Sequence, residues 1–136
     1  MTVTDESQLG FEQSRVLVID DEPAILDLLR LVLQRNGYLV DTESNGEKGL
    51  LRLQTTGPYD AVIVDLMMPG VDGAEVIEAA REDGFVGPMI LCSSVRSPKQ
   101  QSDLVERTGV RVVDKAEAMH TLADELRDLG VSARRR

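Results

Sequence analysis

Short apolar runs alternate with helical patterns along this chain of 136 residues, and that alternation is what most constrains the fold. The apolar runs lie at 15–19, 38–42, 61–64, 89–92 and 110–113. Stretches with apolar residues at helical spacing follow them at 23–36, 45–53, 74–81, 97–108 and 117–129, the fourth being poor in apolar residues. Five strands that alternate with five helices predict an α/β fold, in which a parallel sheet carries helices on both faces.

The length and composition suit a single domain with one sizeable core. Hydrophobic residues make up 42% of the chain and charged residues 29%, which is typical of soluble globular proteins. Residues 1–14 are polar and lack periodicity, so we expect them to be disordered or loosely ordered. We therefore expect a folded domain over 15–130, followed by a basic tail at 131–136.

Composition also excludes several classes of protein. No apolar run approaches the roughly 18 residues of a membrane span, and the acidic N-terminus lacks a signal pattern. We therefore expect a cytoplasmic protein without membrane insertion. The net charge of −9 argues against direct nucleic acid binding, and the basic end at 134–136 is too short to reverse it. The single cysteine, Cys92, excludes an internal disulfide.

Polar side chains stand at the ends of four predicted strands. The first strand ends in Asp20 and Asp21, the third in Asp65, the fourth in Ser93, and the fifth is followed by Lys115. Because the tips of parallel strands lie at one edge of the sheet, we expect these side chains to converge there. Taken singly, the aspartates also fit helix or turn caps, and the serine and lysine fit ordinary surface positions. Their joint placement favours a shared site.

Three carboxylates held close together repel one another unless a cation sits among them. Their hard oxygen atoms suit Mg²⁺, for which Mn²⁺ can substitute, whereas zinc prefers histidine and thiolate ligands that these tips lack. A carboxylate beside such an ion and a lysine is placed to attack phosphorus and form an aspartyl phosphate. Lys115 would neutralise a transferring phosphoryl group, and Ser93 would donate a hydrogen bond to it.

Four motifs make the chain similar to a known family over about residues 14–130. They are VLVIDDEP at 16–23, DLMMPGVDG at 65–73, PMILCSS at 88–94, and Lys115. With them the chain resembles the receiver domains of bacterial two-component response regulators, of the stand-alone, single-domain type. The resemblance implies a flavodoxin-like, doubly wound (βα)5 fold with a five-stranded parallel sheet in the order 2-1-3-4-5.

The resemblance also implies a set of metal ligands. Asp21 and Asp65 would bind Mg²⁺ directly, and Asp20 would act largely through water. The backbone carbonyl of Met67 would complete the ligands that the protein supplies.

A signalling role follows from the same resemblance. Asp65 would accept a phosphoryl group from the phosphohistidine of a histidine kinase or a histidine phosphotransfer protein, and Ser93 and Lys115 would contact that group. Such a domain catalyses only its own phosphorylation and dephosphorylation, so it is a switch rather than an enzyme with a separate substrate. It would pass its signal to an unidentified downstream protein by direct contact.

The chain departs from the family pattern at two positions. Ala116 follows the lysine where the family usually has a proline preceded by a cis bond. A cis bond before a residue other than proline costs about 3 kcal/mol, so we expect a trans bond and a differently shaped loop. Val112 stands where the family often has an aromatic residue, so a rotating aromatic side chain cannot be the output signal.

Two other functions remain open at this point. The departures at Val112 and Ala116 would suit an atypical receiver that acts as a phosphorylation-independent interaction module. A small phosphohydrolase with Asp65 as nucleophile is disfavoured. Such enzymes need a second carboxylate two residues later, where this chain has Met67, and the chain has no room for a cap domain.

Overall fold

The computed structural model describes residues 12–94 and 98–135. Its strands are β1 (Glu12–Gln13), β2 (Arg15–Ile19), β3 (Leu39–Glu43), β4 (Ala61–Asp65), β5 (Met89–Ser93), β6 (Arg111–Asp114) and β7 (Arg134–Arg135). Its helices are α1 (Pro23–Arg35), α2 (Gly46–Thr55), α3 (Gly73–Glu82), α4 (Pro98–Thr108), the 3₁₀ turn η2 (Lys115–Glu117) and α5 (Ala118–Asp128). None of the helices within these residues has the length and apolar character required to cross a bilayer.

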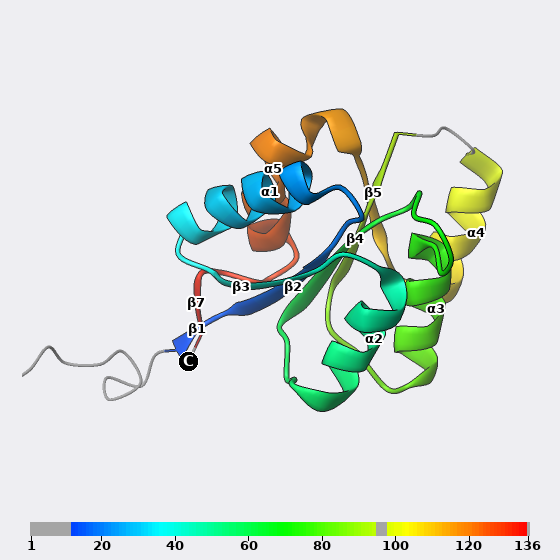
Figure 1. The fold of residues 1–136 in the computed structure, drawn as a ribbon, viewed down its shortest axis with the longest axis horizontal. Helices are drawn as coiled ribbons and strands as arrows, with labels where there is room; N and C mark the ends of the chain where they lie inside the picture. Colours follow the sequence, from blue (N-terminus) through cyan, green and yellow to red (C-terminus); the bar gives the residue numbers. More distant parts are fainter. Residues whose placement is uncertain (1–11, 95–97, 136) are drawn as a thin grey trace, which may run out of the picture.

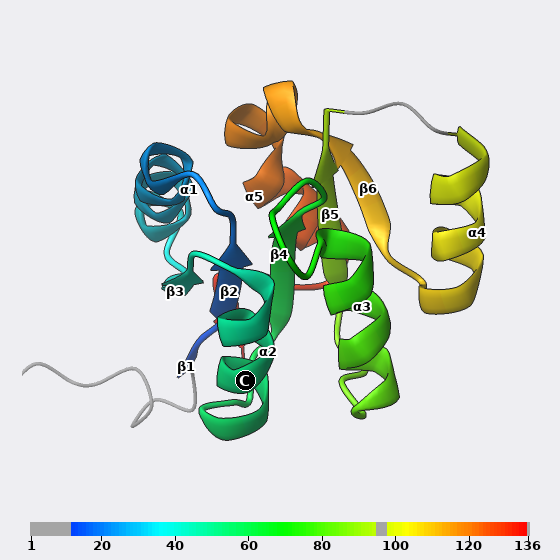
Figure 2. The same ribbon diagram turned by 45° about the vertical axis from the view of Figure 1, so that its right-hand side comes forward.

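The main sheet has the predicted topology. Its five strands are parallel and lie in the order β3-β2-β4-β5-β6, which is 2-1-3-4-5 when the predicted strands are counted. Helices α1 and α5 cover one face, and α2, α3 and α4 cover the other (Figure 1, Figure 2). The flavodoxin-like α/β fold is therefore confirmed.

Two hydrophobic cores hold this sheet, because successive strand residues point to opposite faces. Residues that face α1 and α5 include Val16, Val18, Ala61, Ile63, Ile90 and Cys92. Residues that face α2, α3 and α4 include Leu17, Ile19, Val62, Val64, Met89 and Leu91. Every residue of β4 and β5 is buried, as expected for central strands covered on both faces.

Capping side chains determine where two helices begin at the carboxyl edge of the sheet. The Asn45 side chain accepts a hydrogen bond from the Lys48 backbone and starts α2. Asp72 and Glu75 form a capping box that starts α3. Each cap satisfies backbone N–H groups that the first helical turn leaves unpaired, so the loops above the sheet have defined ends.

The two ends of the domain pair with each other, which the sequence did not predict. Strands β1 and β7 form a separate antiparallel two-stranded sheet. The Ser14 backbone N–H donates to the Ala133 carbonyl at 2.9 Å, and the Tyr38 hydroxyl donates to the Val131 carbonyl at 2.6 Å. Ordered structure therefore extends past the boundaries expected at 15 and 130. Of the segment 1–14 that we expected to be disordered or loosely ordered, residues 1–11 lie outside the described residues.

We predict that Tyr38→Phe lowers the free energy of unfolding by about 1 kcal/mol. The ring is 1% exposed, and the substitution removes only the hydroxyl that satisfies the Val131 carbonyl. Urea denaturation followed by circular dichroism measures the change. Val86→Ala serves as a control, because Val86 is 91% exposed. Equal midpoints for Tyr38→Phe and the unsubstituted chain would contradict this role of the hydroxyl.

Candidate functional site

Four carboxylates gather at the carboxyl edge of the sheet. Asp20 and Asp21 follow β2, Glu22 comes directly after them, and Asp65 is the last residue of β4. One oxygen from each lies within 4.8 Å of the others. Asp20 and Asp65 are 2% and 3% exposed, so two of these charges are buried. The predicted aspartates therefore come together, and Glu22 joins them.

Lys115 reaches this cluster from the far side of the sheet. Its Nζ atom lies 3.0 Å from Asp65 Oδ2, 2.9 Å from Glu22 Oε1 and 3.4 Å from Asp20 Oδ2. The side chain is 19% exposed, so these contacts are shielded from bulk water. Lys115 lies beside Asp65, as predicted, whereas its contact with Glu22 was not predicted.

A 3₁₀ turn positions Lys115 after β6. The Lys115–Ala116 peptide bond is trans, as expected without a proline. The Ala116 backbone N–H donates to Asp114 Oδ1 at 2.8 Å, which caps η2. Proline has no N–H, so this cap requires a residue such as Ala116. The departure from the family pattern thus gives the loop a different support without removing Lys115 from the cluster.

Burial dominates the protonation of the two inner carboxyls. It raises the pKa of Asp20 above its ordinary value, although a backbone hydrogen bond from Glu22 opposes the shift. Burial likewise raises the pKa of Asp65, and the hydrogen bond from Lys115 opposes it. Burial lowers the pKa of Lys115, but hydrogen bonds to Glu22 and Asp65 outweigh that effect and the net shift is upward. The ammonium therefore stays charged beside carboxylates that are costly to ionise.

The loop after β4 supports the Asp65 carboxylate through its backbone and leaves the Met67 side chain exposed. A backbone hydrogen bond from Met67 reaches the Asp65 carboxylate, while the Met67 side chain is 61% exposed. Gly73, the first residue of α3, packs so closely that an added Cβ would lie 2.4 Å from the Asp65 carbonyl oxygen. This close approach needs glycine, and it fixes the backbone of the loop.

Ser93 ends β5 beside the cluster and is 6% exposed. In the sheet it pairs with Asp114, while Asp65 pairs with the preceding Cys92. Gln101 of α4 donates from Nε2 to Ser93 Oγ at 3.1 Å. The sequence analysis missed Gln101. The available signal was its spacing, because Gln101 precedes the buried α4 residues Leu104 and Thr108 by three and seven positions.

The residues present fit a divalent cation. The cluster offers only carboxylate oxygens, which are hard ligands suited to Mg²⁺ or Mn²⁺. The nearby Cys92 thiol is a poor ligand, because burial raises its pKa to about 12. An acidic cluster typical of a magnesium site is therefore in place, with Lys115 as an adjacent positive charge.

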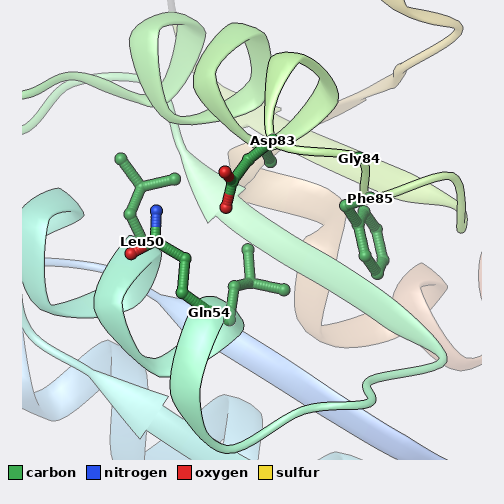
Figure 3. A pocket seen from close by; sticks show the side chains of 7 residues that line it. Leu50, Gln54, Asp83, Gly84 and Phe85 are labelled. Atoms are coloured by element: carbon green, nitrogen blue, oxygen red, sulfur yellow. The ribbon is translucent and has the colours of Figure 1, made fainter.

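A larger cavity of about 640 Å³ lies elsewhere, between α2 and α3. Figure 3 shows Leu50, Gln54, Asp83, Gly84 and Phe85 around it. Among the residues that the structure describes, it shares none with the carboxylate cluster, and Asp83 is the one charged residue that lines it. Its chemistry does not identify it as a reaction site.

Comparison with known proteins is consistent with this geometry. The family "Response regulator receiver domain" matches residues 16–127. Response regulator protein TrrA of Thermotoga maritima, solved in complex with Mg(2+)-BeF, is 35% identical with a TM-score of 0.74, covering 85% of this chain and 98% of that one. Chemotaxis protein CheY4 of Vibrio cholerae is 26% identical with a TM-score of 0.79, covering 87% and 99%.

Curated relatives extend well beyond the matched region. Alkaline phosphatase synthesis transcriptional regulatory protein PhoP of Bacillus subtilis is 38% identical over 80 residues, which is 59% of this chain and 33% of that protein. Transcriptional regulatory protein TrcR of Mycobacterium tuberculosis is 32% identical over 80 residues, or 59% and 31%. The chain thus spans about a third of the length of these relatives.

We predict that Asp20→Asn stabilises the protein at neutral pH in the presence of a chelator. Burial raises the pKa of Asp20 in the folded state above the ordinary value of 3.8. In the pH interval between these two pKa values, the native state binds more protons than the unfolded state. Stability then falls as pH rises through that interval. The gain from Asp20→Asn should accordingly shrink as pH is lowered toward the ordinary aspartate pKa.

Urea midpoints measured across this pH range give the comparison. Asp27→Asn on the exposed side of α1 is the matched control, since it removes a carboxylate that is not buried. A less stable Asp20→Asn at neutral pH would show that Lys115 fully compensates for burial of the carboxylate.

Proposed function

Since this chain belongs to the response regulator receiver domain family, we propose that it is a phosphoacceptor whose Asp65 takes a phosphoryl group in a Mg²⁺-dependent reaction. The observation that supports this most is the position of the buried Asp65 carboxylate, 3.0 Å from Lys115 Nζ and within 4.8 Å of three other carboxylates. Receiver domains are signalling modules, and a phosphorylated aspartate would be the signal.

The chemistry assigns each side chain a role. An Asp65 oxygen attacks the phosphorus of a phosphohistidine, the O–P bond forms and the P–N bond breaks. The imidazole keeps the electron pair and takes up a proton. Lys115 neutralises charge on the phosphoryl oxygens, and the Ser93 hydroxyl donates to one of them. The hydrogen bond from Lys115 favours the ionised Asp65 that the attack requires.

The cation would be held by the acidic cluster. Asp21 and Asp65 are the proposed direct ligands, Asp20 acts through water, and the Met67 backbone carbonyl completes the set. The bound ion would offset negative charge on the transferring phosphoryl group, and Mn²⁺ could replace Mg²⁺. The Mg(2+)-BeF complex of the T. maritima relative supports this choice of ion.

The phosphoryl donor would be a histidine kinase or a histidine phosphotransfer protein, as membership of the receiver family suggests. We propose a cytoplasmic protein that signals to a downstream protein by direct contact. The net charge of −9 supports a protein partner rather than nucleic acid. Catalysis would be limited to phosphorylation and dephosphorylation of the chain itself.

A phosphorylation-independent interaction module is the second candidate. Its support is Val112 at the usual aromatic position. Ala116 no longer favours it, because Lys115 reaches Asp65 through the trans turn. The two candidates differ in whether Asp65 is ever modified.

We predict that incubation with acetyl phosphate or phosphoramidate and Mg²⁺ adds one phosphoryl group, as measured by intact-protein mass spectrometry. Asp65→Asn should give no adduct. Lys115→Ala should slow phosphorylation by about 100-fold, the usual order for loss of one charge-stabilising group. Lys48→Ala, which removes an exposed lysine on α2, is the matched control and should leave the rate unchanged.

Folded protein that gains no adduct with either donor would favour the interaction module. An adduct that persists in Asp65→Asn would place the acceptor elsewhere and contradict the assignment of Asp65.

We also predict that Mg²⁺ stabilises the folded chain. An ion that binds only the native state adds about 2.7 kcal/mol at 100 times its dissociation constant. Urea midpoints with MgCl₂ should exceed those with NaCl at equal ionic strength. Asp21→Asn should remove most of the increase, and Asp27→Asn should keep it. The same increase in Asp21→Asn would rule out Asp21 as a ligand.

A further inference from the structure

Glu22 differs from the buried carboxylates of the cluster in its access to solvent. Its side chain is 59% exposed, whereas the side chains of Asp20 and Asp65 are each 3% exposed. A phosphoryl donor that reaches Asp65 must therefore approach from the solvent side of the cluster, where the Glu22 side chain lies. The charge of Glu22 acts on such a donor before the donor contacts Asp65.

The fold of the loop after β2 does not depend on the Glu22 carboxylate. Glu22 is the N-cap residue of α1, but within the described residues its side chain makes no capping hydrogen bond, and Pro23 begins the helix. The Glu22 backbone N–H donates to Asp20 Oδ1 at 2.9 Å, a contact that any residue except proline can make. An amide in place of the carboxylate should therefore leave this loop as it is.

Lys115 does not depend on Glu22 either. Its Nζ atom lies 3.0 Å from Asp65 Oδ2 and 3.4 Å from Asp20 Oδ2, and both of these partners are shielded from water. The pair with Glu22, at 2.9 Å, involves an exposed carboxylate, and such pairs contribute little to stability. Loss of the Glu22 charge should leave Lys115 beside Asp65, so its main effect is on the molecule that enters the site.

The entrance to the site is negatively charged. In the described part of the chain, the cluster brings four carboxylates together around one ammonium group. One ammonium and one divalent cation would together neutralise three of these carboxylates, and Glu22 holds the outermost charge. Negative charge on a donor is therefore repelled at the entrance, and positive charge is attracted.

Small phosphoryl donors differ in the charge of the group that leaves. With acetyl phosphate, the O–P bond to Asp65 forms, the P–O bond to the acetyl group breaks, and acetate leaves as an anion with the electron pair. With phosphoramidate, whose nitrogen is protonated, the P–N bond breaks and neutral ammonia leaves with the electron pair. A carboxylate at the entrance raises the energy of the first transition state relative to the second.

We propose that Glu22 is a specificity-determining residue, which makes Asp65 selective for donors whose phosphorus is bound to a positively charged nitrogen over acyl phosphates. The inference rests on the proposed phosphoacceptor function. The phosphohistidine of a protein partner belongs to the favoured class, because its phosphorus is bound to an imidazole that can carry a positive charge. Small acyl phosphates react slowly by comparison, so phosphorylation depends on the partner.

The test compares the rates of phosphorylation by acetyl phosphate and by phosphoramidate at saturating Mg²⁺, measured by intact-protein mass spectrometry. Glu22→Gln should raise the acetyl phosphate rate relative to the phosphoramidate rate by about fivefold, the effect of one charge near a protein surface. About 1 M NaCl, which reduces the screening length to roughly 3 Å, should diminish this change. Glu82→Gln removes an exposed carboxylate at the far end of α3 and should leave the ratio unchanged.

The ratio of the two rates separates donor selection from other effects of the substitution. A displaced Lys115 or weaker binding of Mg²⁺ would act on the phosphoryl group that both donors share, and would change both rates alike. Glu22→Asp keeps the charge and should restore the ratio of the unsubstituted chain. Glu22→Lys reverses the charge and should raise the relative acetyl phosphate rate beyond its value in Glu22→Gln.

The failure of this inference can be told apart from the failure of the proposed function. If Glu22→Gln leaves the ratio unchanged, whether both rates change alike or neither does, the proposal is overturned and the proposed function remains intact. An unsubstituted chain that gains no phosphoryl group from either donor would instead overturn the proposed function, and this inference with it.

Discussion

The balance between two buried aspartates and one lysine is the interaction on which this site depends. Asp20 and Asp65 are almost fully buried, and burial makes each reluctant to ionise. Lys115 lies within 3.4 Å of both and offsets part of that cost. Because one ammonium faces several carboxylates, excess negative charge remains. That excess favours a divalent cation, and it leaves Lys115 beside the carboxylate where a phosphoryl group would arrive.

The fold provides the rigidity that such a balance requires. Strands β2 and β4 are neighbours in the sheet, whereas β5 lies between β4 and β6. Lys115 therefore has to reach across the end of β5, and its long side chain makes this possible. Cores on both faces of the sheet hold the strand ends at constant spacing. Gly73 and the Asp114 cap then fix the two loops that carry Asp65 and Lys115.

Local patterns in the sequence were enough to predict a parallel sheet and the convergence of Asp20, Asp65 and Lys115, whereas the order of the strands was predicted from the resemblance to receiver domains. Each of these residues directly follows or ends an apolar strand, so parallel pairing alone brings them to one edge. The roles of Glu22 and Gln101 depend on which loop faces which helix, and no periodicity encodes that. Pairing of β1 with β7 rests on backbone hydrogen bonds between polar segments, which leave no pattern of apolar residues.

Locating the modified residue tests directly whether Asp65 carries the phosphoryl group. Borohydride reduces an aspartyl phosphate to homoserine, so peptide mapping after phosphorylation and reduction identifies the acceptor. We expect homoserine at position 65, at the buried end of β4 beside Lys115. Homoserine at position 20 or 21, or a phosphate ester on Ser93, would contradict it.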